Sequence, residues 1–158
     1  MPPALQIDLS RIDLETEPVF NRDEVLKVNP QCYEMQQLDG ILWYDEEKRL
    51  ILGYKDVTEN EFWVRGHIPG RPLMPAVIMV ECAAQLLSFY VKKILQLDAF
   101  IGFSEIESAT FRLPVTPGQR LLLLGNLTRV RSRKYYAYVQ GVVGDKFIFD
   151  TIVSGMKV

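Results

Sequence analysis

The sequence of 158 residues predicts an α+β fold in which an antiparallel β-sheet wraps around one central helix. Several strand-like segments follow one another through hairpin-sized links, and residues 76–95 form one run that is too apolar for a solvent-exposed helix. Helices do not alternate with strands, and no GxGxxG or P-loop pattern occurs, which disfavours a doubly wound α/β fold. A sheet packed on a buried helix accounts for all three observations.

Residues 1–20 are acidic and only weakly periodic. We expect an irregular lead-in there, although alternating apolar residues would also fit a short strand. Asn21 followed by Glu24 has the spacing of a capping box and predicts a short helix that must end near Pro30. We expect residues 21–158 to form one domain, because a chain of this length buries most of its unfolded surface without metals or disulfides.

Most of the remaining chain has the composition or alternation of strands. The predicted strands are residues 37–44, 49–57, 99–104, 109–115, 120–130, 135–144 and 146–158. The polar residues 45–48 join the first two of these, and Gly144-Asp145 is a short hairpin signal between the last two. Pro117-Gly118 indicates a turn rather than a strand interior.

The central helix is predicted to begin at Met74-Pro75, because proline suits the first turn of a helix, where its missing N–H costs nothing. The N–H groups of Ala76, Val77 and Ile78 are then expected to lack intrahelical partners and to carry the positive end of the helix dipole. Such groups can bind an oxyanion or a carbonyl oxygen.

A narrow polar line interrupts this apolar helix. Glu81, Gln85, Ser88 and Lys92 recur at helical spacing and share one face, and Gln85 can reach Glu81 one turn away. One interpretation is a solvent-facing stripe whose charges complement the helix dipole. The other is that Glu81 faces an internal cleft, where an apolar surround would favour its protonated form and let it act as an acid.

His67 is the only histidine of the chain and lies in the loop ahead of the central helix. Imidazole is the side chain that ordinarily exchanges its proton near neutral pH, so a proton transfer that needs a histidine must use this residue. Gly66, Pro69, Gly70 and Pro75 are typical of turns, and an ordered loop built from them would hold the ring in a fixed place. The alternative is a structural histidine held by hydrogen bonds, and His67 alone does not decide between the two.

Composition argues against several classes of function. A net charge of -2 gives no reason to expect a nucleic-acid or membrane-surface partner. With two cysteines outside any CxxC pair and one histidine, we expect neither a disulfide framework nor a metal site, and we expect Cys82 to be a small core residue. No basic and apolar leader begins the chain, and charged residues interrupt residues 76–95 as a membrane span, so we expect a cytoplasmic protein.

Residues 66–85 read GHIPGRPLMPAVIMVECAAQ. This segment resembles the active-site segment of the 3-hydroxyacyl-[acyl-carrier-protein] dehydratases of dissociated fatty acid synthesis, the FabZ-like group, with its GHFPG-like loop, MPG turn and helix that carries Glu and then Gln. The segments NPQCY at residues 29–33, NEFW at 60–63 and FRLPVTPG at 111–118 are similar to other segments of that family. The resemblance therefore covers roughly residues 21–158, in order.

The resemblance implies a hotdog fold, in which the antiparallel sheet curls around the central helix. It also implies a homodimer, itself able to assemble as a trimer of dimers, with His67 of one protomer near Glu81 of the other. The implied reaction converts a (3R)-hydroxyacyl-[acyl-carrier-protein] thioester to the trans-2-enoyl thioester and water in type II fatty acid biosynthesis. Neither a cofactor nor a metal is implied.

The resemblance also implies a role for each site residue. Neutral His67 removes a proton from C2 of the thioester, and the N–H of Ala76 stabilises charge on the carbonyl oxygen. Glu81, oriented by Gln85, protonates the departing hydroxyl. The implied partner is an acyl carrier protein that presents the chain on phosphopantetheine. Basic residues that could meet this acidic partner are Arg71, Arg112, Arg129, Arg131, Arg133 and Lys134.

The segment departs from the family at several positions. Ala76 stands where the family has glycine, Ile68 where it has phenylalanine, and Gln31-Cys32 and Glu34 where it has His-Arg and proline. Two other functions therefore stay open. One is a hotdog thioesterase, which would hydrolyse the thioester. The other is a non-catalytic subunit that binds an acyl chain or acyl carrier without turnover.

Overall fold

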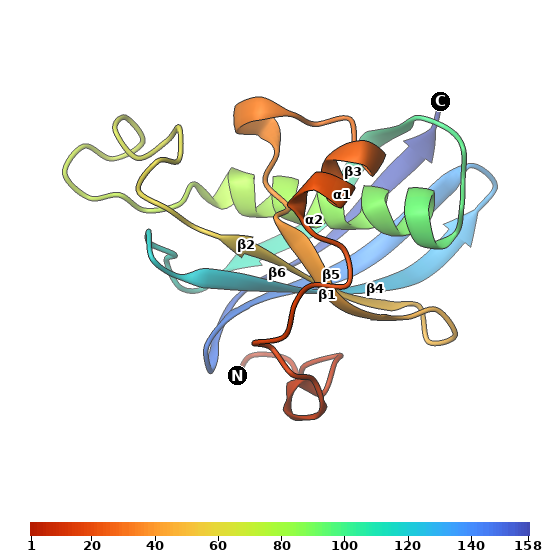
Figure 1. The fold of residues 1–158 in the computed structure, drawn as a ribbon, viewed down its shortest axis with the longest axis horizontal. Helices are drawn as coiled ribbons and strands as arrows, with labels where there is room; N and C mark the ends of the chain where they lie inside the picture. Colours follow the sequence, from red (N-terminus) through yellow and green to blue (C-terminus); the bar gives the residue numbers. More distant parts are fainter.

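The structure, a computed structural model that describes residues 1–158, consists of one antiparallel sheet curled around a long helix (Figure 1). The strands are β1 (Gly40–Asp45), β2 (Leu50–Asp56), β3 (Ile101–Phe111), β4 (Arg120–Arg131), β5 (Lys134–Val143) and β6 (Lys146–Lys157). Their spatial order is β1-β2-β4-β5-β6-β3, and each neighbouring pair is antiparallel. The predicted α+β class and the hotdog arrangement are confirmed.

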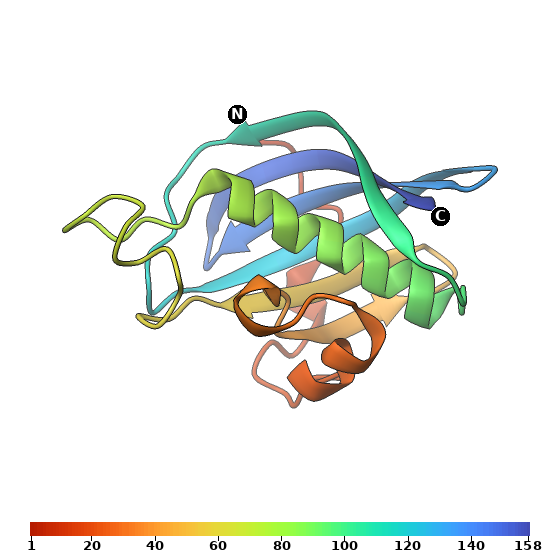
Figure 2. The same cartoon turned by 90° about the horizontal axis from the view of Figure 1, so that it is seen from above.

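The helix α2 (Ala76–Phe89) crosses one face of the sheet and continues into a π-helical turn at Tyr90–Ile94 (Figure 2). Leu86 of α2 packs against Gly53 of β2 and Gly125 of β4, where an added Cβ would lie only 2.7 and 2.8 Å from its methyl groups. These two glycines therefore let the helix lie close to the sheet. No helix of the fold is long and apolar enough to cross a membrane.

The short helix α1 (Arg22–Val28) confirms the prediction made from its capping residues. The Asn21 side chain accepts a hydrogen bond from the N–H of Glu24 at 3.0 Å, and Val25 of α1 is fully buried. The Asn29 side chain then donates to the Gln85 carbonyl at 2.9 Å. In Figure 2, α1 and the residues after it lie on one side of α2, and β3 lies on the other. α1 and the residues after it therefore cover part of α2.

The N-terminal residues form no strand. Apart from a 3₁₀ turn at Leu9–Arg11 they are irregular, and they lie on the face of the sheet opposite α2 (Figure 1). Gln6 ties them to the sheet, because its side chain donates to the carbonyls of Leu124 and Tyr138 at 2.8 and 3.1 Å. Ile7 is buried in a small apolar cluster on this outer face.

One strand prediction was wrong. Residues 99–104 and 109–115 were expected as two strands, whereas β3 is a single strand that ends at Phe111. Its pairing with β6 has register shifts between Phe103 and Glu105 and between Ile106 and Ser108. Such bulges interrupt the alternation of side chains, so one bulged strand has the pattern of two shorter ones.

Candidate active site

His67 lies in the loop between β2 and α2, where two hydrogen bonds fix it. Its backbone N–H donates to the Trp63 carbonyl at 2.9 Å, and its ring Nδ1 lies 2.8 Å from the Leu73 carbonyl oxygen. A carbonyl oxygen only accepts, so Nδ1 carries the hydrogen. In the neutral ring Nε2 is then free to accept a proton. His67 is exposed to solvent, so a ligand can reach it.

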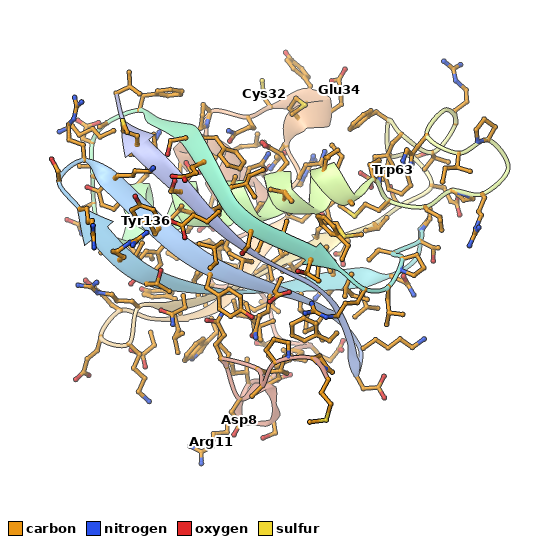
Figure 3. All side chains as sticks on the ribbon, turned by 180° about the vertical axis from the view of Figure 1, so that it is seen from behind. Asp8, Arg11, Cys32, Glu34, Trp63 and Tyr136 are labelled. Carbon is orange, nitrogen blue, oxygen red and sulfur yellow. The ribbon has the colours of Figure 1, made fainter.

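The loop itself is anchored at several points. Trp63 is 3% exposed and lies at the inner end of the loop, near the beginning of α2 (Figure 3). Gly70 has a φ of +79°, a left-handed conformation that other residues rarely adopt. Met74 donates its N–H to the Val115 carbonyl at 2.8 Å, which joins the end of the loop to the turn before β4. Gly70 therefore permits a turn of the loop that a residue with a side chain would rarely form.

The beginning of α2 differs in detail from the prediction. Pro75 is the N-cap residue rather than part of the first turn, and its carbonyl accepts the N–H of Ile78 at 2.9 Å. The expectation that Ile78 lacks a partner was therefore wrong, because the first turn closes one residue early. Ala76 and Val77 donate no hydrogen bond, and Ala76 has no positive φ. The alanine thus occupies the helix start without backbone strain.

Glu81 and Gln85 contact each other as predicted. The Gln85 side-chain nitrogen donates to Glu81 Oε1 at 2.8 Å and to the Met35 carbonyl at 2.7 Å. Its side-chain oxygen accepts the N–H groups of Gln37 and Leu38 at 2.9 and 3.1 Å. A carbonyl can only accept and an N–H can only donate, so these partners fix the orientation of the amide. Gln85 therefore holds one oxygen of the half-buried Glu81 carboxyl in place.

The interpretation of the polar line as a solvent-facing stripe was wrong for its middle. Gln85 is 1% exposed and Ser88 is buried. The covering residues come from the segment after α1, whose Cys32 and Glu34 lie above α2 in Figure 3. Helical periodicity identifies a shared face, but it does not report which distant segment covers that face.

A small cavity of about 40 Å³ borders Glu81 between α2 and the sheet. Its walls are formed by Gln31, Glu81, Ala84, Leu87, Ser88, Ile101, Phe103, Val153, Ser154 and Gly155. Two larger open cavities, of about 650 and 710 Å³, include neither His67 nor Glu81 in their walls. The acid and the base themselves share no hydrogen bond or ion pair within one chain.

A buried charge network that the sequence did not reveal lies next to the loop of His67. Lys55 Nζ lies 2.9 Å from Glu61 Oε1 and 3.8 Å from Asp39 Oδ2, and all three side chains are largely buried. Burial raises the pKa of Asp39 despite the nearby Lys55. Burial also favours the protonated form of Glu61, but hydrogen bonds from Lys55 and Thr58 outweigh it and hold the pKa of Glu61 below its ordinary value.

Two further predictions concern single residues. Cys82 is fully buried, and burial raises the pKa of its thiol, so it is the small core residue that was expected. Among the basic residues suggested for an acidic partner, Arg112, Arg129 and Lys134 pair with Asp150, Glu107 and Glu105. The other three, which are Arg71, Arg131 and Arg133, form no ion pair.

Comparison with known proteins identifies related sequences. The sequence model of the FabA-like domain matches residues 29–152. A relative from Chlamydia trachomatis, named 3-hydroxyacyl-[acyl-carrier-protein] dehydratase FabZ, is 32% identical and aligns with 89% of this chain and 94% of its own. A relative of the same name from Erythrobacter litoralis is 36% identical over 85% of this chain and 93% of its own.

A solved structure shares the fold. It is the dehydratase heterocomplex ApeI:P from Xenorhabdus doucetiae, which matches with a TM-score of 0.54 at 22% identity, over 70% of this chain and 89% of the other. At this identity the likeness concerns the fold alone.

Proposed function

This chain belongs to the FabA-like family and is a FabZ-like hotdog dehydratase, and from that premise we propose that His67 and Glu81 carry the reaction. The substrate is a (3R)-hydroxyacyl thioester on an acyl carrier protein, and the products are the trans-2-enoyl thioester and water, as a step of fatty acid biosynthesis. The observation that carries the proposal is the hydrogen bond from His67 Nδ1 to the Leu73 carbonyl, because it leaves Nε2 as a base.

The first step removes a proton from C2. Nε2 of neutral His67 accepts this proton, and the electrons of the broken C–H bond move toward the thioester carbonyl. The negative charge that develops on the carbonyl oxygen needs donors, and the free N–H groups of Ala76 and Val77 supply them at the positive end of α2. Alanine serves here as well as glycine, because the donor is the backbone and its helical conformation is unstrained.

The second step expels the hydroxyl group from C3. Glu81 gives its proton to the departing oxygen, the C3–O bond breaks, and the double bond forms between C2 and C3. Glu81 Oε1 accepts the hydrogen bond from Gln85, so the proton that Glu81 donates is on its second carboxyl oxygen. Loss of water leaves a protonated histidine and a glutamate carboxylate, and proton exchange restores both for the next turnover.

The complete site needs a second copy of the chain. β3 pairs only with β6, so its outer edge carries unpaired backbone groups, and from Phe103 onward all of its residues are exposed. Phe103, Ile106 and Phe111 are apolar side chains on this exposed strand. Exposed edges of this kind pair readily with another strand. We propose a homodimer formed through β3, in which His67 of one protomer approaches Glu81 of its partner.

The acyl carrier protein is the proposed macromolecular partner. Carrier proteins of this class present the acyl chain on a phosphopantetheine arm, and an acidic carrier would be attracted to cations that are free of intramolecular partners. Arg71 belongs to the loop of His67, Arg131 is the last residue of β4, and Arg133 lies in the turn between β4 and β5. These three residues are therefore the proposed docking contacts.

The test uses the purified protein and a 3-hydroxyacyl-[acyl-carrier-protein] thioester, with formation of the enoyl product followed by absorbance and mass spectrometry. We expect enoyl thioester from the wild-type protein and none from His67→Ala. Release of free acid would instead indicate the thioesterase. If wild type and His67→Ala both bind the thioester and neither converts it, the chain is the non-catalytic subunit and the enzymatic proposal is wrong.

A further inference from the structure

We propose that Lys55 is a positioning residue for His67, acting through Glu61 on the loop that carries the base. The inference rests on the proposed function, because it takes His67 as the base. Lys55 belongs to β2, and its ion pairs are with Asp39 and Glu61 rather than with Glu81. Its effect would be transmitted along a continuous chain of hydrogen bonds.

The first link is the buried ion pair. The Lys55 side chain is 6% exposed and Glu61 is 10% exposed, and their charged atoms lie 2.9 Å apart. Asp39 lies farther away, 3.8 Å from Lys55, and has Arg22 at 3.4 Å and the N–H of Asp56 at 2.8 Å as other partners. Glu61 is therefore the principal partner of the Lys55 ammonium group.

The second link joins Glu61 to the loop backbone. Its other carboxyl oxygen accepts the N–H and the hydroxyl of Thr58 at 2.9 and 3.0 Å. The Glu61 carbonyl accepts the N–H of Val64 at 3.1 Å, and the Trp63 carbonyl accepts the N–H of His67 at 2.9 Å. Two successive turns thus connect Glu61, one member of the ion pair, to the backbone of His67.

Charge makes the ion pair sensitive to loss of either member. A buried charge without its partner is strongly unfavourable, so the loop would move Glu61 toward water if Lys55 lost its ammonium group. Because Glu61 begins the turns that lead to His67, such a movement would displace Nε2. A displacement of about 1 Å can reduce the rate of an enzymatic step by roughly a hundredfold.

The experiment compares Glu61→Gln, Lys55→Met and Lys55→Arg with wild type. Lys55 borders an open cavity of about 710 Å³, and arginine at this position keeps the positive charge. The control is Arg120→Met, which removes a half-exposed ion pair with Asp56 at the adjacent position of β2. Neither side chain of that pair forms a hydrogen bond with the loop of His67. If Lys55→Met does not fold, Glu61→Gln decides the question. Glutamine keeps an acceptor oxygen for Thr58, so this variant is expected to fold.

Two readouts are taken below the unfolding temperature of every variant. The first is the separation of kcat from KM with the carrier thioester. The second is the amide resonance of His67 in protein labelled with ¹⁵N-histidine, which gives a single backbone signal because the chain has one histidine. We expect kcat to fall about 10- to 100-fold in Glu61→Gln and Lys55→Met, with KM changed less than about twofold and the His67 signal shifted. Lys55→Arg should restore most of the rate.

Three results would overturn the inference: a kcat within about twofold of wild type, a His67 signal that does not move, or an equal loss of kcat in Arg120→Met. His67→Ala separates this failure from failure of the proposed function. If His67→Ala is inactive while Glu61→Gln is normal, only the positioning role is wrong. If His67→Ala keeps its activity, the assignment of His67 as the base is wrong, and the inference falls with it.

Discussion

Replacing Gln85 with methionine should destabilise the fold by about 3 kcal/mol, because the amide satisfies backbone groups that have no other partner. The Gln85 side chain is 1% exposed and accepts the N–H groups of Gln37 and Leu38 within the core. Methionine has nearly the same length and fills the space, so the loss isolates the hydrogen bonds from the packing.

The magnitude follows from the number of stranded groups. Each buried donor left without a partner costs about 1–3 kcal/mol, so the two N–H groups together cost roughly 2–6 kcal/mol. The Met35 carbonyl contributes less, because Met35 is exposed and water can reach its backbone. A loss near 3 kcal/mol corresponds to a melting temperature lower by roughly 6–12 °C for a chain of this size.

Thermal and urea unfolding measure this loss, and Gln36→Met is the matched control. Gln36 is also a buried glutamine, but its side chain makes one hydrogen bond, of 3.3 Å, to the Arg22 carbonyl. We expect the control to lose no more than about 1 kcal/mol. Equal losses in the two variants would refute the view that Gln85 is the residue that holds the covering segment on α2.

Other predictions address the site and its surroundings. Glu81→Gln should lower kcat by at least about a hundredfold with an unchanged melting temperature, since the amide has the same shape but no acidic proton; full activity would remove Glu81 from the mechanism. Ala76→Gly should leave kcat within about threefold, because the same N–H is offered, and a tenfold gain would mean that the alanine obstructs the substrate. The pKa of Glu61 is lowered in the fold, so its contribution to stability is present above its ordinary pKa of 4.5 and is lost as pH falls through the folded value. Urea unfolding should therefore give a constant difference between wild type and Glu61→Gln above pH 4.5 and a shrinking difference below it; a difference that grows at low pH would contradict the assigned sign.

Local patterns predicted the elements whose causes are local. Asn21 caps α1 through a residue three positions away, and the hairpin at Gly144 depends on a single glycine with a φ of +59°. α2 was predicted from its apolar run, and the contact between Glu81 and Gln85 from one helical turn. In each case the residues that determine the structure are near neighbours in the sequence.

The errors arose where distant segments meet. The face of Gln85 is buried because residues far away in the sequence cover it, and helical spacing carries no information about them. The pair of Lys55 and Glu61 was missed for another reason: the two residues are close in the sequence, but their contact depends on how the loop after β2 folds back, which neither helical nor strand spacing reports. Bulges in β3 depend on its partner β6, so alternation within β3 alone gave two strands instead of one.

Complementation between two inactive variants tests the central claim most directly, which is that His67 and Glu81 form one site across a dimer. His67→Ala and Glu81→Gln are co-expressed with different affinity tags, and dimers that carry both tags are isolated. If each site takes His67 from one protomer and Glu81 from the other, the mixed dimer contains one site with both substitutions and one site with neither. We therefore predict about half of the wild-type kcat per dimer. Activity no higher than that of either single variant would contradict the account.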